Sequence, residues 1–256
     1  KILELKTTNI NRFSIGVQSF HDLDLQFMKR EHSGQEAVES IKNLQDKGWN
    51  NISIDLIYGT PTLTNKNWGE NISTTIKLDV PHVSAYALTV EKNTELYHKI
   101  KSNSCQPIDE EQVKTQFVKL IDVLNKKGFI HYEISNFSKK GYFSKHNSNY
   151  WKREKYLGIG PSAHSFNGET RQWNISNNAL YILSIQNKNI RFEIEELTEA
   201  VCYNEYLLTS LRTIWGVDID FVKSHFSSFF NDFLMISIKK WIKSGHIYKK
   251  MGKINL

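Results

Sequence analysis

Three polar side chains stand in or beside apolar, strand-like segments near the start of the chain. Gln18 ends the apolar part of NRFSIGVQSF, and Asp55 interrupts the apolar run IDLIYGTP. A carboxylate inside an apolar run is unfavourable unless it is paired or binds a ligand. Arg30, in the segment MKREHS, is the cation expected to share a cleft with Asp55. Together these groups could bind a polar, charged ligand; the alternative is a buried Asp–Arg pair that only ties a helix to the sheet.

The segments that hold these side chains follow a strand–helix order. Three short runs are largely apolar, as buried parallel strands are: residues 12–17, 52–58 and 82–88. Helices are expected at residues 34–47, after a Ser33–Glu36 capping box, and at residues 66–76. The alternation predicts an α/β fold with a parallel sheet, and Gln18 lies at the carboxyl edge, the reactive face of parallel barrels.

The middle of the chain predicts one more helix, one more strand and a long irregular stretch. Asp109 and Gln112 can open a helix that ends at Gly128, and a strand is expected at residues 130–134. Residues 135–178 are rich in Gly, Ser, Asn and aromatic residues. A stretch of that length is too long for an ordinary connection, so we expect it to form the wall of a site.

The last part of the chain has a different pattern. Its apolar spacing predicts helices at residues 197–211, 219–226 and 230–242, followed by a hairpin in which the chain stops. Three helices and a hairpin make a winged-helix-like domain. Several lysines there could contact phosphates, but the third helix is apolar along most of its length and offers few side chains to base edges. Nucleic acid is therefore not an expected partner.

Composition narrows the class of protein. No run approaches the roughly 20 apolar residues of a membrane span. The formal charge is +6, but lysines are scattered among Asn, Ser and Glu, which favours a general lysine enrichment over an anionic partner. Cys105 and Cys202 fit no disulfide framework and no metal or redox spacing, so they indicate a reducing compartment, and the cytoplasm is expected.

Four segments in this order resemble one known family. NRFSIGVQSF, KREHS, NISIDLIYGTP and HVSAYALTVE look like successive barrel segments of the oxygen-independent coproporphyrinogen III oxidases and their haem-chaperone relatives, in the radical S-adenosylmethionine superfamily. The resemblance implies the later part of a radical S-adenosylmethionine (β/α) barrel and a small helical, winged-helix-like C-terminal domain. It implies three parts: the barrel part at residues 1–134, the loop region of the substrate or haem site at 135–190, and the C-terminal domain at 191–256.

The resemblance also implies a pocket for S-adenosylmethionine. The matching positions are Gln18, Arg30, Asp55, Thr89 and His164. Gln18 and Asp55 can bond the ribose hydroxyls or the aminoacyl group, and Arg30 can pair with the methionyl carboxylate through its planar fork.

Family members hold a [4Fe–4S] cluster on three cysteines spaced C-x-x-x-C-x-x-C. That spacing does not occur in this sequence, and its two cysteines cannot replace it. The chain by itself is therefore not expected to cleave S-adenosylmethionine reductively, and no catalytic or metal-binding residue is assigned.

The segment HNSNYW separates the two branches of the family. His146, Asn147, Tyr150 and Trp151 match the HNxxYW motif of the haem chaperones, whose histidine is implicated in haem binding and which the oxidases lack. An imidazole beside two aromatic rings offers an axial iron ligand and a surface for a flat macrocycle. A basic rim could meet the propionates: Lys145, Lys152 and Arg153. The alternative is a histidine bonded to its own loop, with the aromatic rings filling core space.

The favoured hypothesis is a haem chaperone that holds haem and passes it to acceptor proteins. The enzyme alternative is an oxygen-independent coproporphyrinogen oxidase, which decarboxylates two propionates of a porphyrinogen through a 5′-deoxyadenosyl radical. A nucleic-acid-binding winged helix is the third and weakest hypothesis. Because the partial barrel is expected to begin inside a domain and to leave strand edges exposed, the chain could also form a homodimer.

Overall fold

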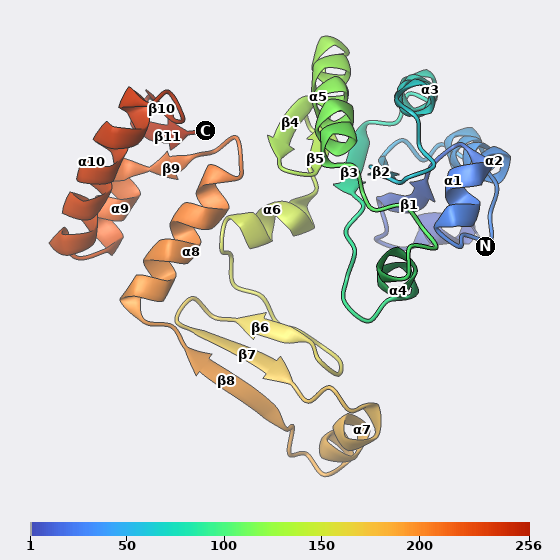
Figure 1. Cartoon of the computed structure of the whole chain (residues 1–256). Helices are drawn as coiled ribbons and strands as arrows, with labels where there is room; N and C mark the ends of the chain where they lie inside the picture. Colours follow the sequence, from blue (N-terminus) through green and yellow to red (C-terminus); the bar gives the residue numbers. More distant parts are fainter. Residues whose placement is uncertain (1) are drawn as a thin grey trace. The chain divides into compact units, whose positions relative to one another are not determined.

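The structure is a computed structural model and describes residues 2–256. The chain divides into two compact units, Lys1–Phe143 and Ser144–Leu256 (Figure 1). Each unit has its own cluster of buried apolar side chains. The three-part division at residues 134 and 190 stays a prediction.

The first unit is built on a five-stranded sheet with the order β1-β2-β3-β5-β4. Its first three strands are parallel and lie within a residue of the expected positions: β1 (Phe13–Gln18), β2 (Ile52–Tyr58) and β3 (His82–Ala87). β5 (Asn136–Ser138) runs antiparallel between β3 and β4 (Ile130–Glu133). The sequence did not indicate β5, because a buried three-residue strand has no readable alternation.

One face of this sheet is covered by three helices, which share a core with it: α2 (Gly34–Asp46), α3 (Asn65–Lys77) and α5 (Glu110–Lys126). The expected capping box opens α2, since the Ser33 hydroxyl accepts from the Glu36 backbone and the Glu36 carboxylate accepts from the Ser33 backbone at 2.7 Å. Shorter helical segments complete the unit: η1 (Glu4–Thr7), α1 (Asp22–Phe27) and α4 (Glu95–Lys101).

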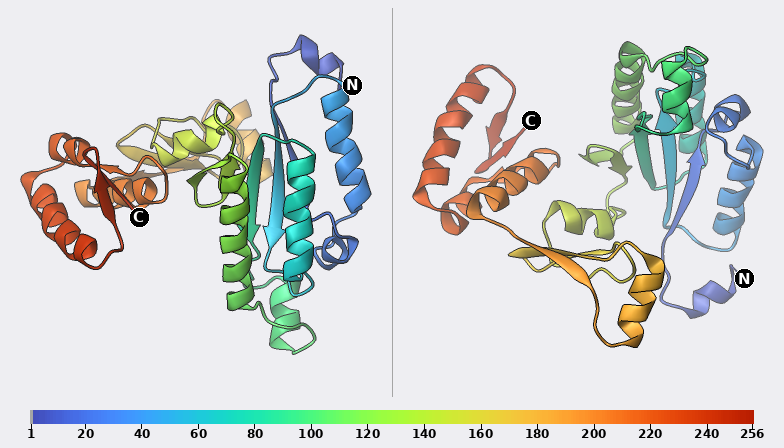
Figure 2. Two further views of the ribbon diagram at one scale, coloured as in Figure 1. Left: turned by 90° about the horizontal axis from the view of Figure 1, so that it is seen from above. Right: turned by 60° about the horizontal axis from the view of Figure 1, so that its bottom comes forward.

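The second unit begins with α6 (Lys145–Trp151) and continues into a three-stranded antiparallel sheet (Figure 2). The strands are β6 (His164–Phe166), β7 (Thr170–Asn174) and β8 (Phe192–Glu196), and α7 (Asn178–Gln186) connects the last two. Residues 135–178 are thus less irregular than the sequence indicated. β7 pairs with β8, which lies further along the chain, and β6 pairs with β7, so local patterns do not reveal these strands.

The C-terminal part of this unit is the expected winged-helix-like arrangement. Its helices are α8 (Glu199–Leu211), α9 (Ile219–His225) and α10 (Ser228–Lys243). Its three-stranded sheet has the order β10-β11-β9, from β9 (Val217–Asp218), β10 (Tyr248–Lys250) and β11 (Lys253–Asn255). The α/β class with a small helical C-terminal part is therefore confirmed.

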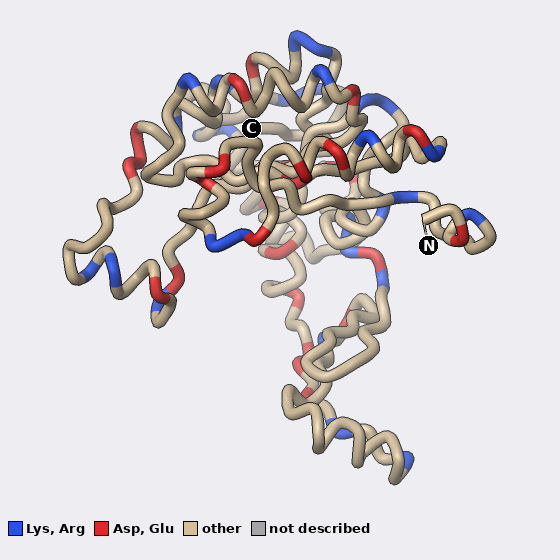
Figure 3. The backbone as a smooth tube through the Cα atoms, turned by 90° about the vertical axis from the view of Figure 1, so that its right-hand side faces the viewer, with Lys and Arg blue, Asp and Glu red and all other residues tan. Residues whose placement is uncertain are grey.

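Charge is mixed along the backbone rather than gathered. Figure 3 shows Lys and Arg positions interspersed with Asp and Glu positions. Within residues 2–256 no helix is both long and apolar enough to span a bilayer. The cytoplasmic location and the homodimer stay predictions.

Candidate functional site

Gln18 ends β1 in the left-handed region of backbone space, with φ of +65°. This conformation is uncommon for a residue with a side chain and is kept only where the surroundings impose it. The Gln18 side chain folds back over Gly16: a Cβ at Gly16 would lie 2.8 Å from Gln18 Nε2. Gly16 therefore leaves the space that the amide of Gln18 occupies.

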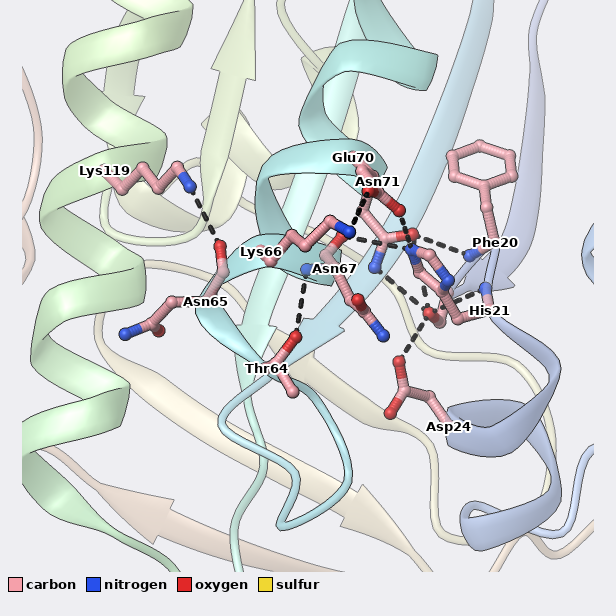
Figure 4. Close-up of polar contacts among 11 residues, drawn as sticks. Phe20, His21, Asp24, Thr64, Asn65, Lys66, Asn67, Glu70, Asn71 and Lys119 are labelled. Carbon is pink, nitrogen blue, oxygen red and sulfur yellow. Dashed lines mark hydrogen bonds and ion pairs between the residues drawn. The ribbon is translucent and has the colours of Figure 1, made fainter.

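The turn after Gln18 is held by a buried polar network, drawn in Figure 4. Ser19 donates to Asp24 at 3.0 Å and accepts from the Asn71 amide at 3.0 Å. Asn71 in turn accepts from the Phe20 backbone at 2.8 Å. Asp24 also accepts from the Thr62 hydroxyl at 2.6 Å. Because these groups are buried and bonded to one another, they fix the backbone immediately after Gln18.

Asp55 lies in the middle of β2 on the face of the sheet away from the helices. Ser14 of β1 lies 3.5 Å from both of its carboxylate oxygens, and Ser84 of β3 is its neighbour across the ladder. Burial raises the pKa of Asp55, while the two serines and the nearby Arg12 act in the opposite direction. The carboxylate is thus partly desolvated and held between two strands, ready to accept bonds from a ligand.

The arginine beside Asp55 is Arg12, whereas Arg30 was expected from the sequence to share its cleft. Arg12 donates to Asn51 at 3.1 Å and to the backbone carbonyl of Tyr142 at 3.0 Å. Burial lowers the pKa of Arg12. The sequence did not link Arg12 to Asp55, because only the pairing of β1 with β2 brings the two residues together.

Arg30 is exposed and lines a separate cavity of about 430 Å³ at the carboxyl ends of β2 and β3. Ile57 and Leu88 also line it, and Thr89, the residue after Leu88, is exposed. Glu95 of α4 is in the same wall, where hydrogen bonds from Lys29 and Lys99 lower its pKa to about 2. The guanidinium group of Arg30 could therefore pair with a ligand carboxylate in this cavity, which Asp55 does not line.

The face of the sheet that carries Ser14, Asp55 and Ser84, called the polar face below, also carries residues that the sequence did not single out. Asn136 is paired with Ser84 across the ladder and donates to Glu133, while its own Oδ1 is buried without a partner. Tyr86 is half-exposed; burial raises its pKa, and the negative charges of Asp55 and Glu133 act in the same direction. The alternation of polar residues in β2 and β3 was the readable signal for this face.

An unpartnered buried acceptor is unfavourable, so this polar face has capacity for a ligand donor such as a ribose hydroxyl or an amino group. Gln18 and Asp55 therefore fit the polar part of S-adenosylmethionine. The iron–sulfur cluster does not fit, because within residues 2–256 no group of three or more His, Cys, Asp or Glu side chains could hold a metal ion. Cys105 and Cys202 are both free and belong to different units.

The second unit holds His164 and the HNxxYW residues. His164 opens β6 with an exposed ring that stacks on Trp173 at 5.8 Å. His146 and Asn147 lie in the first turn of α6, Asn147 half-buried and His146 exposed. The His146 ring meets Tyr150, one turn further on, edge-on with the ring centres 4.9 Å apart. The imidazole is therefore accessible at the surface of α6.

The two aromatic residues of the motif line different cavities of the second unit. Tyr150 faces a cavity of about 290 Å³, whereas Trp151 faces one of about 830 Å³. Arg153 lines both, and it and Arg171 are ion-paired with Glu205. Burial opposes ionisation of Glu205, but the two guanidinium groups hold its pKa below the usual range.

Comparisons with known proteins relate the chain to one superfamily. Residues 1–74 match the family model described as "Radical SAM superfamily". The chain is 34% identical over 218 residues to the heme chaperone HemW of Bacillus subtilis, covering 85% of this chain and 58% of that protein. It is 29% identical over 252 residues to the heme chaperone HemW of Lactococcus lactis, covering 98% of this chain and 66% of that protein.

A solved structure gives the same fold. Coproporphyrinogen III oxidase (HemN) from Escherichia coli, titled as a radical SAM enzyme, superposes with a TM-score of 0.79 at 19% identity, over 100% of this chain and 62% of that one. At this sequence identity the likeness shows the fold alone. The chain spans 58% and 66% of the length of the two chaperones that it matches.

Proposed function

Because the chain belongs to the radical S-adenosylmethionine superfamily, in the group of the HemW and HemN proteins, we propose that it is a haem chaperone. The observation that carries the proposal is the similarity to proteins named heme chaperone, together with an HNxxYW helix that presents His146 to solvent. An exposed imidazole can take up and release an iron ligand. Its role would be to bind haem reversibly and to pass it to an acceptor protein.

Within this proposal, the first unit would bind S-adenosylmethionine. Asp55 would accept bonds from ribose hydroxyls, Gln18 would bond the polar end of the ligand, and Arg30 would pair with its carboxylate. In the superfamily a [4Fe–4S] cluster supplies the electron that starts radical chemistry from this cofactor. The residues that would hold such a cluster are absent from this sequence, so no step of that chemistry is assigned to the chain.

Thr89 and His164 stay predictions as contacts of the cofactor. Thr89 follows β3 beside the cavity that Arg30 lines, which supports its assignment. His164 lies in the other unit, where its ring stacks on Trp173.

A haem titration of the 256-residue chain, followed by absorbance, tests the function. We expect wild type to shift the Soret band and His146→Ala to lose the ligand contributed by α6. His98→Ala is a matched control, because His98 is also exposed and also meets a neighbouring tyrosine edge-on, Tyr97 at 5.5 Å. Absence of any Soret shift with wild type would contradict the proposal.

A further inference from the structure

The 830 Å³ cavity of the second unit is a second place suited to a flat ligand. It lies within Ser144–Leu256, and its volume falls in the usual range of about 300–1,000 Å³ for small-molecule sites. Six aromatic residues line it, from α6, β6, α8, the loop before β9, α9 and the residue after α9: Trp151, Phe166, Tyr206, Trp215, Phe221 and Phe226. His146 is not among the residues that line it.

His225, the last residue of α9, also lines this cavity. Its ring stacks on Phe221 with centres 3.9 Å apart and an angle of 14°, which fixes the plane of the imidazole. His225 is exposed and lines the cavity, so its side chain is accessible to a ligand.

The hydrogen bonds of His225 assign its tautomer. Nδ1 lies 3.1 Å from the backbone carbonyl of Phe221, which can only accept, so Nδ1 carries the proton. Nδ1 also lies 2.8 Å from the hydroxyl of Ser224, whose own proton goes to the carbonyl of Asp220 at 2.8 Å. Nε2 therefore carries the lone pair. A histidine that donates from one ring nitrogen to a backbone carbonyl and keeps the lone pair on the other nitrogen has the usual arrangement of a metal ligand.

Two lysines in the wall of the cavity could pair with carboxylates of a ligand. Lys152 lies over the Trp215 ring at 4.8 Å, and Lys253 of β11 is also in the wall. Arg153 is already paired with Glu205, so the two lysines are the cations that a ligand can engage. Three acidic residues share the rim, Glu154, Glu169 and Asp218, and keep the local charge balanced. A ligand with carboxylates at one edge of a flat apolar ring fits such a cavity.

We infer that this cavity binds an iron tetrapyrrole with Nε2 of His225 on the iron, as a second haem site separate from His146. The inference rests on the proposed function, since the chemistry that fits the cavity is that of haem. The surface histidine of α6 then exchanges haem with partners, and the aromatic cavity holds it.

The test is a haem titration of the full 256-residue chain with four proteins: wild type, His225→Ala, His146→Ala and His246→Ala. His246 is the matched control, because its Nδ1 also bonds a serine, Ser244 at 2.7 Å, but the residue does not line the cavity. We expect two haem equivalents for wild type and His246→Ala, and one for each of the other variants. Free imidazole should restore the lost axial ligand in His225→Ala.

Binding of metal-free protoporphyrin IX, followed by tryptophan fluorescence, separates a lost ligand from a lost fold. His225→Ala should quench like wild type, because the rings and lysines of the cavity remain. A His225→Ala protein that still binds two haems overturns the inference. So does loss of the second haem in Cys202→Ser, because Cys202 also lines the cavity and would then be the iron ligand in place of His225. If wild type binds one haem and His146→Ala loses it, the second site is wrong and the proposed function is retained. If wild type binds no haem, both the second site and the proposed function are wrong.

Discussion

The side-chain amide of Gln18 occupies the space above Gly16, where a Cβ would come within 2.8 Å of its Nε2. Ser14 and Gly16 are two residues apart on β1 and so share the polar face, where Ser14 contacts Asp55. The Gln18 amide lies over Gly16 on this face, although the register with β2 shifts between Ile15 and Gln18. Two features thus fix the position of the amide. Gly16 has no side chain and leaves the space, and the hydrogen-bond network around Ser19 and Asn71 fixes the backbone after Gln18.

Gly16→Ala should weaken S-adenosylmethionine binding about five- to tenfold, because the new methyl group displaces the Gln18 amide; that loss corresponds to roughly 1–1.4 kcal/mol. Calorimetric titration of the purified chain measures it. In the double variant Gly16→Ala/Gln18→Ala the two effects should not add, since both act through one side chain. Full additivity would show that Gly16 acts by another route.

His82 should make the first unit less stable in acid. It is buried, with Nδ1 2.7 Å from the Ser53 hydroxyl and Nε2 2.7 Å from the Tyr132 hydroxyl, and burial, together with the charge of Arg12, lowers its pKa to about 3. Between pH 3 and about 6.5 the unfolded chain binds the proton and the folded chain does not, so stability falls as pH falls through this window.

Urea unfolding at pH 7, 6 and 5 measures this loss, which should approach about 1.4 kcal/mol per pH unit at the low end. His82→Gln should have a smaller pH slope, and His98→Gln, at an exposed site, should keep the wild-type slope. Equal slopes for His82→Gln and wild type would argue against a buried neutral imidazole.

Glu205→Gln should destabilise the second unit by about 1–3 kcal/mol, because Arg153 and Arg171 would lose the carboxylate that both of them contact. All three side chains are less than a third exposed, so solvent does not fully replace the interaction. Thermal unfolding checks it, with the exposed Glu154→Gln as control. A change below about 0.5 kcal/mol would mean that the pair behaves as a surface ion pair.

Ser33→Ala should cost about 1 kcal/mol, because it removes the hydroxyl that caps α2 and leaves the Glu36 backbone N–H without its acceptor. Ser40→Ala, at an exposed interior position of the same helix, should be neutral or slightly stabilising. The denaturant midpoints of Ser33→Ala and Ser40→Ala are compared. Similar midpoints would show that the capping box does not stabilise the protein.

Elements whose signals are local could be predicted from the sequence. The parallel strands, the helix after Ser33 and the helix after Asp109 were readable, because apolar spacing and cap residues act within a few residues. The HNSNYW segment likewise indicated the haem hypothesis without any structure.

Tertiary structure alone decided what depends on residues distant in the chain. It placed Arg12 rather than Arg30 beside Asp55, because strand pairing, not sequence order, brings a cation to a carboxylate. It inserted the unexpected β5 and so set Asn136 opposite Ser84. It also gathered His225 with Trp151 and Trp215 around one cavity. Contacts of this kind are fixed by packing and ladder register, for which a single sequence carries no local signal.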